Sequence, residues 1–201
     1  MITLNAKKNL VLSAAVMGLT LGAASSAQAN IVTDGNFTNI GANWNPNGNF
    51  LYTDYSHPDG AITTAIGMGT VGYFGNVSQT LATNPGTTYR ISFDLEHPYI
   101  DSYFVGGGNT GFQALFGSNT LLSLIPIGYM PNYTAYTFTS LASNASTLLR
   151  FNEREDPAYI YLTNVSVSAV PLPASVQMFG LGLLGLVGFA YYNRRKNGFV
   201  A

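Results

Sequence analysis

The sequence predicts an all-β fold, an antiparallel β-sandwich, flanked by a targeting segment at each end of the chain. Between Asn30 and Val170, polar and apolar residues alternate over short stretches, as they do in strands with one buried face. No long stretch of this region has the 3.6-residue period of an amphipathic helix, and Gly, Asn and Pro residues separate the strand-like stretches. Long apolar runs beside basic residues occur only at the two ends of the 201-residue chain.

The N-terminal end has the three parts of a Sec-type signal peptide. Lys7 and Lys8 precede an apolar run over 10–24, and Ala27-Gln28-Ala29 then supplies the small residues of a cleavage site. We therefore expect that residues 1–29 are removed and that the mature chain begins at Asn30, outside the cytoplasm. An uncleaved N-terminal anchor is the alternative, and the small-residue end favours cleavage over it.

Five stretches of the domain are predicted as strands. In chain order they are 71–80, 87–96, 133–139, 148–151 and 159–167, and the longest loops are 41–49, 57–69 and 99–109. Four apolar residues share the buried face of stretch 87–96: Tyr89, Ile91, Phe93 and Leu95. Tyr73 and Val77 are expected to face inward in stretch 71–80. In the last stretch Tyr161, Val165 and Val167 fit an inward face, and Leu162 breaks the phase, which predicts a β-bulge.

The domain between the targeting segments is acidic. The whole chain has a net charge of −1, but five of its eight basic residues lie in the two ends, and all nine acids lie in the domain. The domain therefore carries a charge of −6 and lacks the basic patch on which nucleic-acid binding depends. The absence of Cys excludes disulfides, thiolate nucleophiles and Cys-ligated metals.

The domain also resembles a known family along its length. Residues 30–37 (Asn-Ile-Val-Thr-Asp-Gly-Asn-Phe) are similar to the Asn-Leu-Val-x-Asn-Gly-x-Phe-Glu start of galactose-binding-like jelly-roll domains. Trp44 and the segments 75–80, 85–89, 93–95 and 161–167 match further motifs of that family. The resemblance implies a jelly-roll β-sandwich over residues 30–169.

In that family a structural Ca²⁺ near the chain ends uses a Glu after the opening Phe and an Asp in a closing Leu-Asp-Asp-Val. Here those positions hold Thr38 and Thr163-Asn164, so both carboxylates are missing, although Ca²⁺ prefers anionic oxygen ligands. We therefore expect no metal. Asp34 and Asn164 are the possible remnants of a calcium site, and no other cofactor is expected.

Loop aromatics are the candidates for glycan binding, because sugar rings stack on aromatic rings while polar side chains bind the hydroxyl groups. The candidates are Trp44, Tyr55, Tyr99 and Tyr103. The stretch from Tyr99 to Tyr103, which three glycines follow, is the best candidate for an exposed patch. Packing in the core is the alternative, and it is favoured for Trp44.

Two further groups of side chains could have a catalytic or metal-binding role, but each also has an ordinary structural explanation. The charge cluster over 152–157 offers the carboxylate pair of a glycosidase, but a solvated turn in which Arg154 offsets its neighbours is favoured. His57 and His97 each precede Pro in a loop, so solvent exposure is favoured over a zinc site. The sequence contains no Gly-x-Ser-x-Gly elbow. It therefore identifies no catalytic residue.

The C-terminal end has the features of a membrane segment. The stretch from Ala174 to Tyr192 is uncharged, and as a helix at about 1.5 Å per residue it would be roughly 28 Å long, close to a bilayer core of about 30 Å. Arg194, Arg195 and Lys196 follow and predict a cytoplasmic C-terminus by the positive-inside rule. We expect a transmembrane helix over 174–192 with a basic end.

The same tail resembles a sorting signal. Val170-Pro171-Leu172-Pro173, followed by Phe179-Gly180 and a Gly/Leu-rich run, is similar to the PEP-CTERM signal of Gram-negative bacteria in its Val-Pro-Leu-Pro-Ala variant. The resemblance implies recognition by an exosortase, an integral-membrane processing enzyme, and removal of the tail. It also implies a link to biofilm, with this chain as the substrate. A permanent single-pass anchor is the alternative.

These observations predict an exported, non-catalytic protein of the cell surface or extracellular matrix of a Gram-negative bacterium, which is held at the inner membrane only during sorting. The expected partners are an exosortase-type enzyme, the membrane and extracellular polysaccharide. A secreted glycan-active hydrolase and a permanently tethered structural or adhesion protein are the alternative interpretations.

Overall fold

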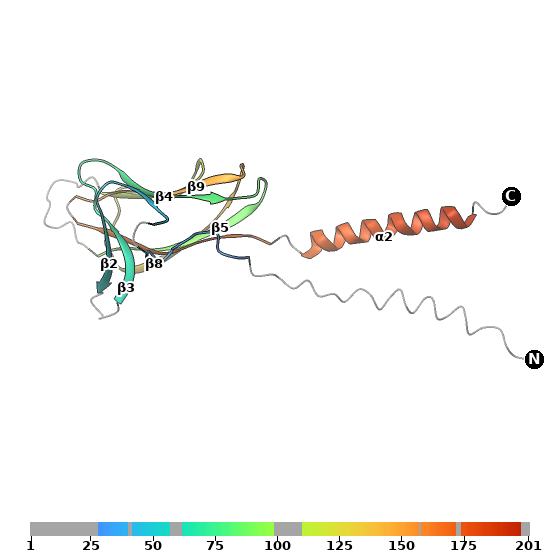
Figure 1. Cartoon of the computed structure of the whole chain (residues 1–201), viewed down its shortest axis with the longest axis horizontal. Coiled ribbons are helices and arrows are strands. Elements are labelled where there is room, and N and C mark those ends of the chain that lie inside the picture. The colour runs from blue at the N-terminus through green and yellow to red at the C-terminus, as the bar shows by residue number, and fades with distance from the viewer. Residues whose placement is uncertain are drawn as a thin grey trace, which may run out of the picture. The chain divides into compact units, whose positions relative to one another are not determined.

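Two five-stranded antiparallel sheets make up the folded domain in the computed structural model (Figure 1), which describes residues 28–39, 42–56, 62–98, 110–156, 158–171 and 174–197. Sheet 1 contains, in spatial order, β1 (Asn45–Asn47), β4 (Gly75–Ala82), β9 (Ser146–Arg154), β6 (Gly111–Phe116) and β7 (Asn119–Leu124). Sheet 2 contains β2 (Phe50–Ser56), β3 (Ile62–Met68), β10 (Ile160–Ala169), β5 (Thr88–His97) and β8 (Met130–Leu141). The predicted antiparallel β-sandwich is confirmed.

Alternation of apolar and polar residues explains the strands of the interior. The four residues predicted to face inward in β5 are all buried, as is Val77 in β4. Tyr73 is 55% exposed, so its predicted inward position is wrong. The reason is that β4 begins at Gly75, and residues 71–74 lie in the loop before it, where the strand alternation does not apply.

The predicted bulge in β10 is confirmed, but it changes which residues face inward. The pairing of β10 with β5 shifts between Thr163 and Ser166, and Asn164 has a φ of 52°. Ile160 and Leu162 join the core before the bulge, and Val165 and Val167 join it afterwards. Tyr161 alternates with these residues and is buried, at 4% exposure, but it packs beside Tyr159, with ring centroids 6.4 Å apart, and not in the core between the sheets, which corrects its predicted inward position.

Several strands lie in segments that were predicted as loops or for which no structure was predicted. The strand β1 falls inside the predicted loop 41–49, and β3 inside the predicted loop 57–69; β2, β6 and β7 were not predicted at all. The sequence of β3, Ile-Thr-Thr-Ala-Ile-Gly-Met, has no clear alternation. It forms a strand because it pairs with β2 on one side and with β10 on the other.

Aromatic rings fill the space between the sheets. Phe93 of sheet 2 contacts Phe151 of sheet 1 edge-on at 5.2 Å and Phe112 at 5.9 Å. Trp44 packs on Phe37 at 5.1 Å and on Phe151 at 6.2 Å, and its indole N–H donates to the Asp34 carbonyl at 3.0 Å. These contacts join the two sheets to each other and the segment before β1 to sheet 1.

The N-terminal segment is tied to the last strand. The Ile31 N–H donates to the Val167 carbonyl at 2.8 Å, and the Asn30 side chain accepts from the Val167 N–H at 2.9 Å. The residues from Gln28 to Val170 form one compact unit. Ala29 is exposed, while Ala27 and the rest of the predicted signal peptide lie outside the described residues, so cleavage stays a prediction.

The C-terminal segment contains the helix α2 (Ala174–Asn197), which confirms a helix at this place. In the described part of the chain, no helix is long and apolar enough to cross a membrane, so the transmembrane part of the prediction over 174–192 is not supported.

The predicted sorting motif and basic end are only partly described. Val170 ends the compact unit, with its N–H donating to the Thr88 carbonyl at 2.8 Å, and Pro171 is exposed. Leu172 and Pro173 lie outside the described residues, as do the side chains of Arg195 and Lys196. Their predicted roles in sorting stay predictions.

Candidate functional site

A row of polar side chains crosses all five strands on the outer face of sheet 1. The paired positions Asn47, Asn76, Asn152, Gln113 and Ser123 follow one another from β1 to β7, and we call them the polar row. The residues that alternate with them, among them Val77, Phe151 and Phe112, point into the core. The polar row is therefore the solvent side of this sheet.

Hydrogen bonds between neighbours hold part of the polar row in place. The Asn152 side-chain amide donates to the Gln113 side-chain oxygen at 3.3 Å. The Gln113 amide nitrogen then donates to the Ser123 hydroxyl at 3.2 Å. Each of these groups keeps further donors or acceptors, because an amide side chain has two N–H groups and two lone pairs. The row thus presents donors and acceptors side by side.

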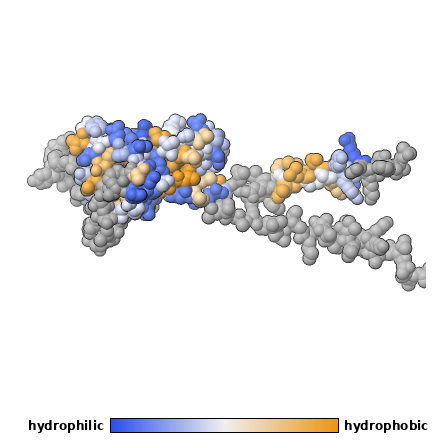
Figure 2. Space-filling view, viewed as in Figure 1, coloured by the Kyte–Doolittle hydropathy of each residue, from blue (hydrophilic) through white to orange (hydrophobic). Residues whose placement is uncertain are grey.

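An apolar edge borders the polar row. Phe74 and Ile125 lie over Gly111, which is two residues along β6 from Gln113 and so on the same face. A Cβ at Gly111 would lie only 3.1 Å from the Phe74 ring and 3.0 Å from Ile125, so the glycine leaves room for both. Phe74 is 42% exposed and Ile125 is 55% exposed. Figure 2 shows the hydropathy of one side of the domain, where hydrophilic and hydrophobic residues are intermixed.

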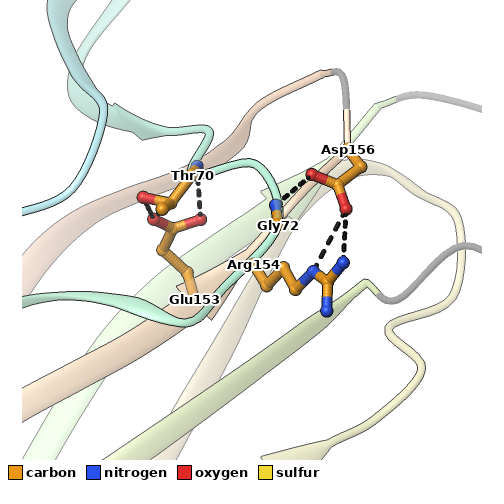
Figure 3. Close-up of polar contacts among 5 residues, drawn as sticks. All are labelled: Thr70, Gly72, Glu153, Arg154 and Asp156. Carbon is orange, nitrogen blue, oxygen red and sulfur yellow. Dashed lines mark hydrogen bonds and ion pairs between the residues drawn. The ribbon is translucent and has the colours of Figure 1, made fainter.

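An ion pair holds the loop that carries Phe74. Asp156 accepts two hydrogen bonds from the Arg154 guanidinium, at 2.9 and 3.1 Å, and one from the Gly72 N–H at 2.9 Å (Figure 3). Gly72 has a φ of 86°, a conformation that glycine adopts without strain. The chain after β9 therefore fixes the loop before β4, and with it the apolar edge.

Beneath that loop lies a buried carboxyl group. Glu153 is fully buried, and both of its oxygens accept from the Thr70 N–H at 3.2 Å. The Thr70 hydroxyl donates to the same carboxyl and accepts from the Asn49 N–H at 3.0 Å (Figure 3). Burial raises the pKa of Glu153 above its ordinary value, and the two bonds from Thr70 offset only part of this effect.

The raised pKa of Glu153 predicts how stability depends on pH. The folded protein binds this proton more tightly than the unfolded chain, so the stabilisation is fully present below pH 4.5 and is lost as the pH rises through the higher folded pKa. Glu153→Gln keeps an acceptor for Thr70 without a charge. We expect this variant to be more stable than the parent at pH 8 and equal to it at pH 4 in denaturant unfolding. A variant less stable than the parent at pH 8 would contradict the prediction.

The favoured interpretation of residues 152–157 as a solvated turn is wrong for its two glutamates. Glu155 and His97 are each 1% exposed and lie 3.2 Å apart, between Oε2 and Nε2. His97 Nδ1 lies 3.0 Å from the Gly128 carbonyl, an acceptor, so Nδ1 carries a proton. Because Glu153 and Glu155 are both held inside the protein, they do not form a solvent-facing glycosidase pair.

Of the four predicted glycan-binding aromatics, only Trp44 has a side chain that the structure describes. Trp44 is 2% exposed, so it has the favoured core position and offers no ring face to a sugar. Tyr55 belongs to β2, and its side chain lies outside the described residues. Tyr99, Tyr103 and His57 lie outside them altogether. Sequence reasoning missed the polar row. Of its five residues only Asn76, which precedes the predicted inward residue Val77, lay in a predicted strand.

The possible calcium remnants are occupied by protein contacts. Asp34, with a φ of 56°, accepts from the Thr38 N–H at 2.8 Å, the Thr38 hydroxyl at 3.1 Å and the Asn39 N–H at 3.3 Å. Asn164 donates to the Asp94 carboxylate at 2.6 Å. No cluster of three or more His, Cys, Asp or Glu side chains suited to a metal occurs among the residues that the structure describes. Asp34 therefore serves to close the turn before Trp44.

No protein-family model matches the chain, and no curated protein matches it in sequence. Solved structures do match its fold. A carbohydrate-binding module in complex with β-1,4-galactotriose is 11% identical, with a TM-score of 0.52 over 71% of this chain and 99% of that one. The xylan-binding domain CBM22-1 of Paenibacillus barcinonensis is 11% identical, with a TM-score of 0.50 over 74% and 100%.

The enzymatically active domain of tailspike protein 4 from bacteriophage CBA120 also matches, with 19% identity and a TM-score of 0.50. The match covers 70% of this chain but only 21% of the tailspike chain. At such identities the likeness concerns the fold. The domain therefore has the β-sandwich of carbohydrate-binding modules, which agrees with its resemblance to galactose-binding-like jelly rolls.

Proposed function

We propose that this protein is an exported, non-catalytic polysaccharide-binding protein of the cell surface or extracellular matrix. The polar row and the apolar edge of sheet 1 form its binding face. The observation that carries the proposal is the alignment of five polar side chains across all five strands, beside a partly exposed ring. The fold that the domain shares with carbohydrate-binding modules supports it.

The chemistry of the face suits a sugar polymer. Hydroxyl groups of sugars both donate and accept hydrogen bonds, and Asn and Gln side chains do the same. Neighbouring strands lie about 4.8 Å apart, so four steps across the sheet make the polar row roughly 19 Å long. That length accommodates several linked sugar units. The apolar faces of sugar rings can pack on Phe74 and Ile125 at its border, as ligands do in sites that combine aromatic and polar groups.

Substitutions in the polar row test this proposal. We expect Asn152→Ala and Gln113→Ala each to weaken polysaccharide binding about tenfold, because each leaves a hydrogen-bonding group of the ligand without its partner. Affinity electrophoresis through gels that contain galactan, xylan or exopolysaccharide from the producing cells measures the effect. Asn132→Ala, at an exposed Asn of β8 in sheet 2, is the matched control and should bind like the parent. Equal retention of all three variants would contradict the proposal.

We also propose that residues 170–201 form a sorting signal that an exosortase-type enzyme reads and removes after export. The likeness of 170–174 and the following Gly/Leu-rich run to PEP-CTERM signals supports this part of the proposal. The intact mass of the native protein tests it. A species that begins at Asn30 and ends between Val170 and Ala174 is the expected result, and a species that runs to Ala201 would contradict it.

A further inference from the structure

The binding face has a cation of its own. Arg150 lies on the outer face of β9, two residues from Asn152, between its paired neighbours Ser78 of β4 and Leu115 of β6. Its Nε atom is buried and has no hydrogen-bond partner among the residues that the structure describes. Arg150 as a whole is only half-buried, so a ligand can reach its guanidinium, and no acceptor among the described residues occupies the Nε–H.

The other two arginines of the domain are placed differently. Arg154 is already paired with Asp156, through two hydrogen bonds. Arg90 is exposed on β5, in sheet 2, where it alternates with the buried residues Tyr89 and Ile91. Arg150 is therefore the arginine that can offer both its charge and its donors to a ligand on the polar row.

The same face holds few acids, although the domain as a whole is acidic. The strands of sheet 1 contain one carboxyl residue, Glu153, which is buried in the interior. Asp94 points outward from sheet 2, where it binds Asn164. Packed sheets lie about 10 Å apart, and salt screens exposed charges over about 8–10 Å, so Asp94 repels an anion on the far face only weakly.

We infer that the binding face selects polysaccharides that carry carboxylate groups, such as polymers of uronic acids. This inference rests on the proposed function of the same face. The planar guanidinium of Arg150 presents two parallel N–H groups, the geometry that matches a carboxylate. At about 3.4 Å per residue along β9, Arg150 lies roughly 7 Å from Asn152, so the carboxylate and the hydroxyl groups of one short stretch of polymer reach both.

The test compares acidic and neutral forms of one polymer. Polygalacturonate and its methyl-esterified form share a backbone but differ in charge, and alginate supplies a second uronate polymer. The protein is used as recovered from the producing cell, at 50 and 500 mM NaCl. We expect tighter binding to polygalacturonate and alginate than to the ester, and weaker binding to the acidic polymers at high salt.

Two variants with the same change of charge separate a specific contact from general attraction. We expect Arg150→Gln to weaken binding to the acidic polymers about tenfold and to leave binding to the ester unchanged. Arg90→Gln, on the other sheet, should bind all three polymers like the parent. Thermal unfolding of both variants checks that each is folded.

Four results would overturn the inference. Equal losses in Arg150→Gln and Arg90→Gln would mean that only net charge matters. Equal binding of polygalacturonate and its ester would contradict the carboxylate selectivity but not the proposed function. Binding of neutral polymers without binding of acidic ones would have the same meaning. Failure to bind any acidic or neutral polysaccharide would overturn the proposed function together with the inference.

Discussion

Replacing Phe151 with Ala is expected to lower the free energy of unfolding by about 3–5 kcal/mol. The Phe151 ring is fully buried and contacts Phe93 at 5.2 Å, Phe112 at 6.0 Å and Trp44 at 6.2 Å. It is thus the ring through which β9 contacts both sheet 2 and the segment before β1. Because domains are stable by only about 5–15 kcal/mol, this loss is a large part of the total. Chemical denaturation followed by tryptophan fluorescence measures it, since Trp44 is the single Trp.

Leu148→Ala is the matched control for that prediction. Leu148 belongs to the same strand but is 38% exposed on its outer face. Its removal opens no cavity in the core, so we expect a loss below about 1 kcal/mol. Similar losses in the two variants would mean that the rings between the sheets do not dominate the stability of the sandwich.

Replacing His97 with Ala is expected to cost about 3 kcal/mol of stability, because it removes one partner of a buried pair and leaves the Glu155 carboxyl in the interior. Both side chains are 1% exposed, so water cannot take the place of the imidazole without opening the structure. The loss of the bond between His97 and the Gly128 carbonyl adds to the cost. Equilibrium unfolding in urea at pH 7 measures the change.

A second substitution separates the charge from the packing. Glu155→Gln in the His97→Ala background removes the buried charge and should restore part of the lost stability. If the double variant is as unstable as the single one, the loss comes from the missing ring and not from the unpaired carboxyl. Arg154→Ala offers a further comparison, since it breaks the partly exposed pair with Asp156 and should cost about 1 kcal/mol or less.

The sequence predicted the interior strands best where alternation was long. In β5 the residues at every second position, from Tyr89 to Leu95, were assigned to the buried face and are buried. The break of phase at Leu162 correctly indicated a bulge, but the inward face before the bulge consists of Ile160 and Leu162. Once a strand contains an extra residue, alternation counted from one end gives the wrong face at the other.

The candidate site was harder to predict than the fold. The sequence directed attention to loop aromatics, and Trp44 has the core position that was favoured for it, between Phe37 and Phe151. The polar row consists of ordinary Asn, Gln and Ser residues on separate strands. Nothing in the spacing of Asn76, Gln113 and Asn152 along the chain indicates that they become neighbours.

The sequence by itself determined the class of fold, the inward face of β5, the helix near the C-terminus and the acidic character of the domain. Only the tertiary structure decided which strands are neighbours, and hence that five polar side chains align across sheet 1. It also decided that Glu153 and Glu155 are buried, although their charge predicted exposure. The reason is physical: alternation needs only the residues next along the chain, whereas the surroundings of Glu153 are set by Thr70, 83 positions away.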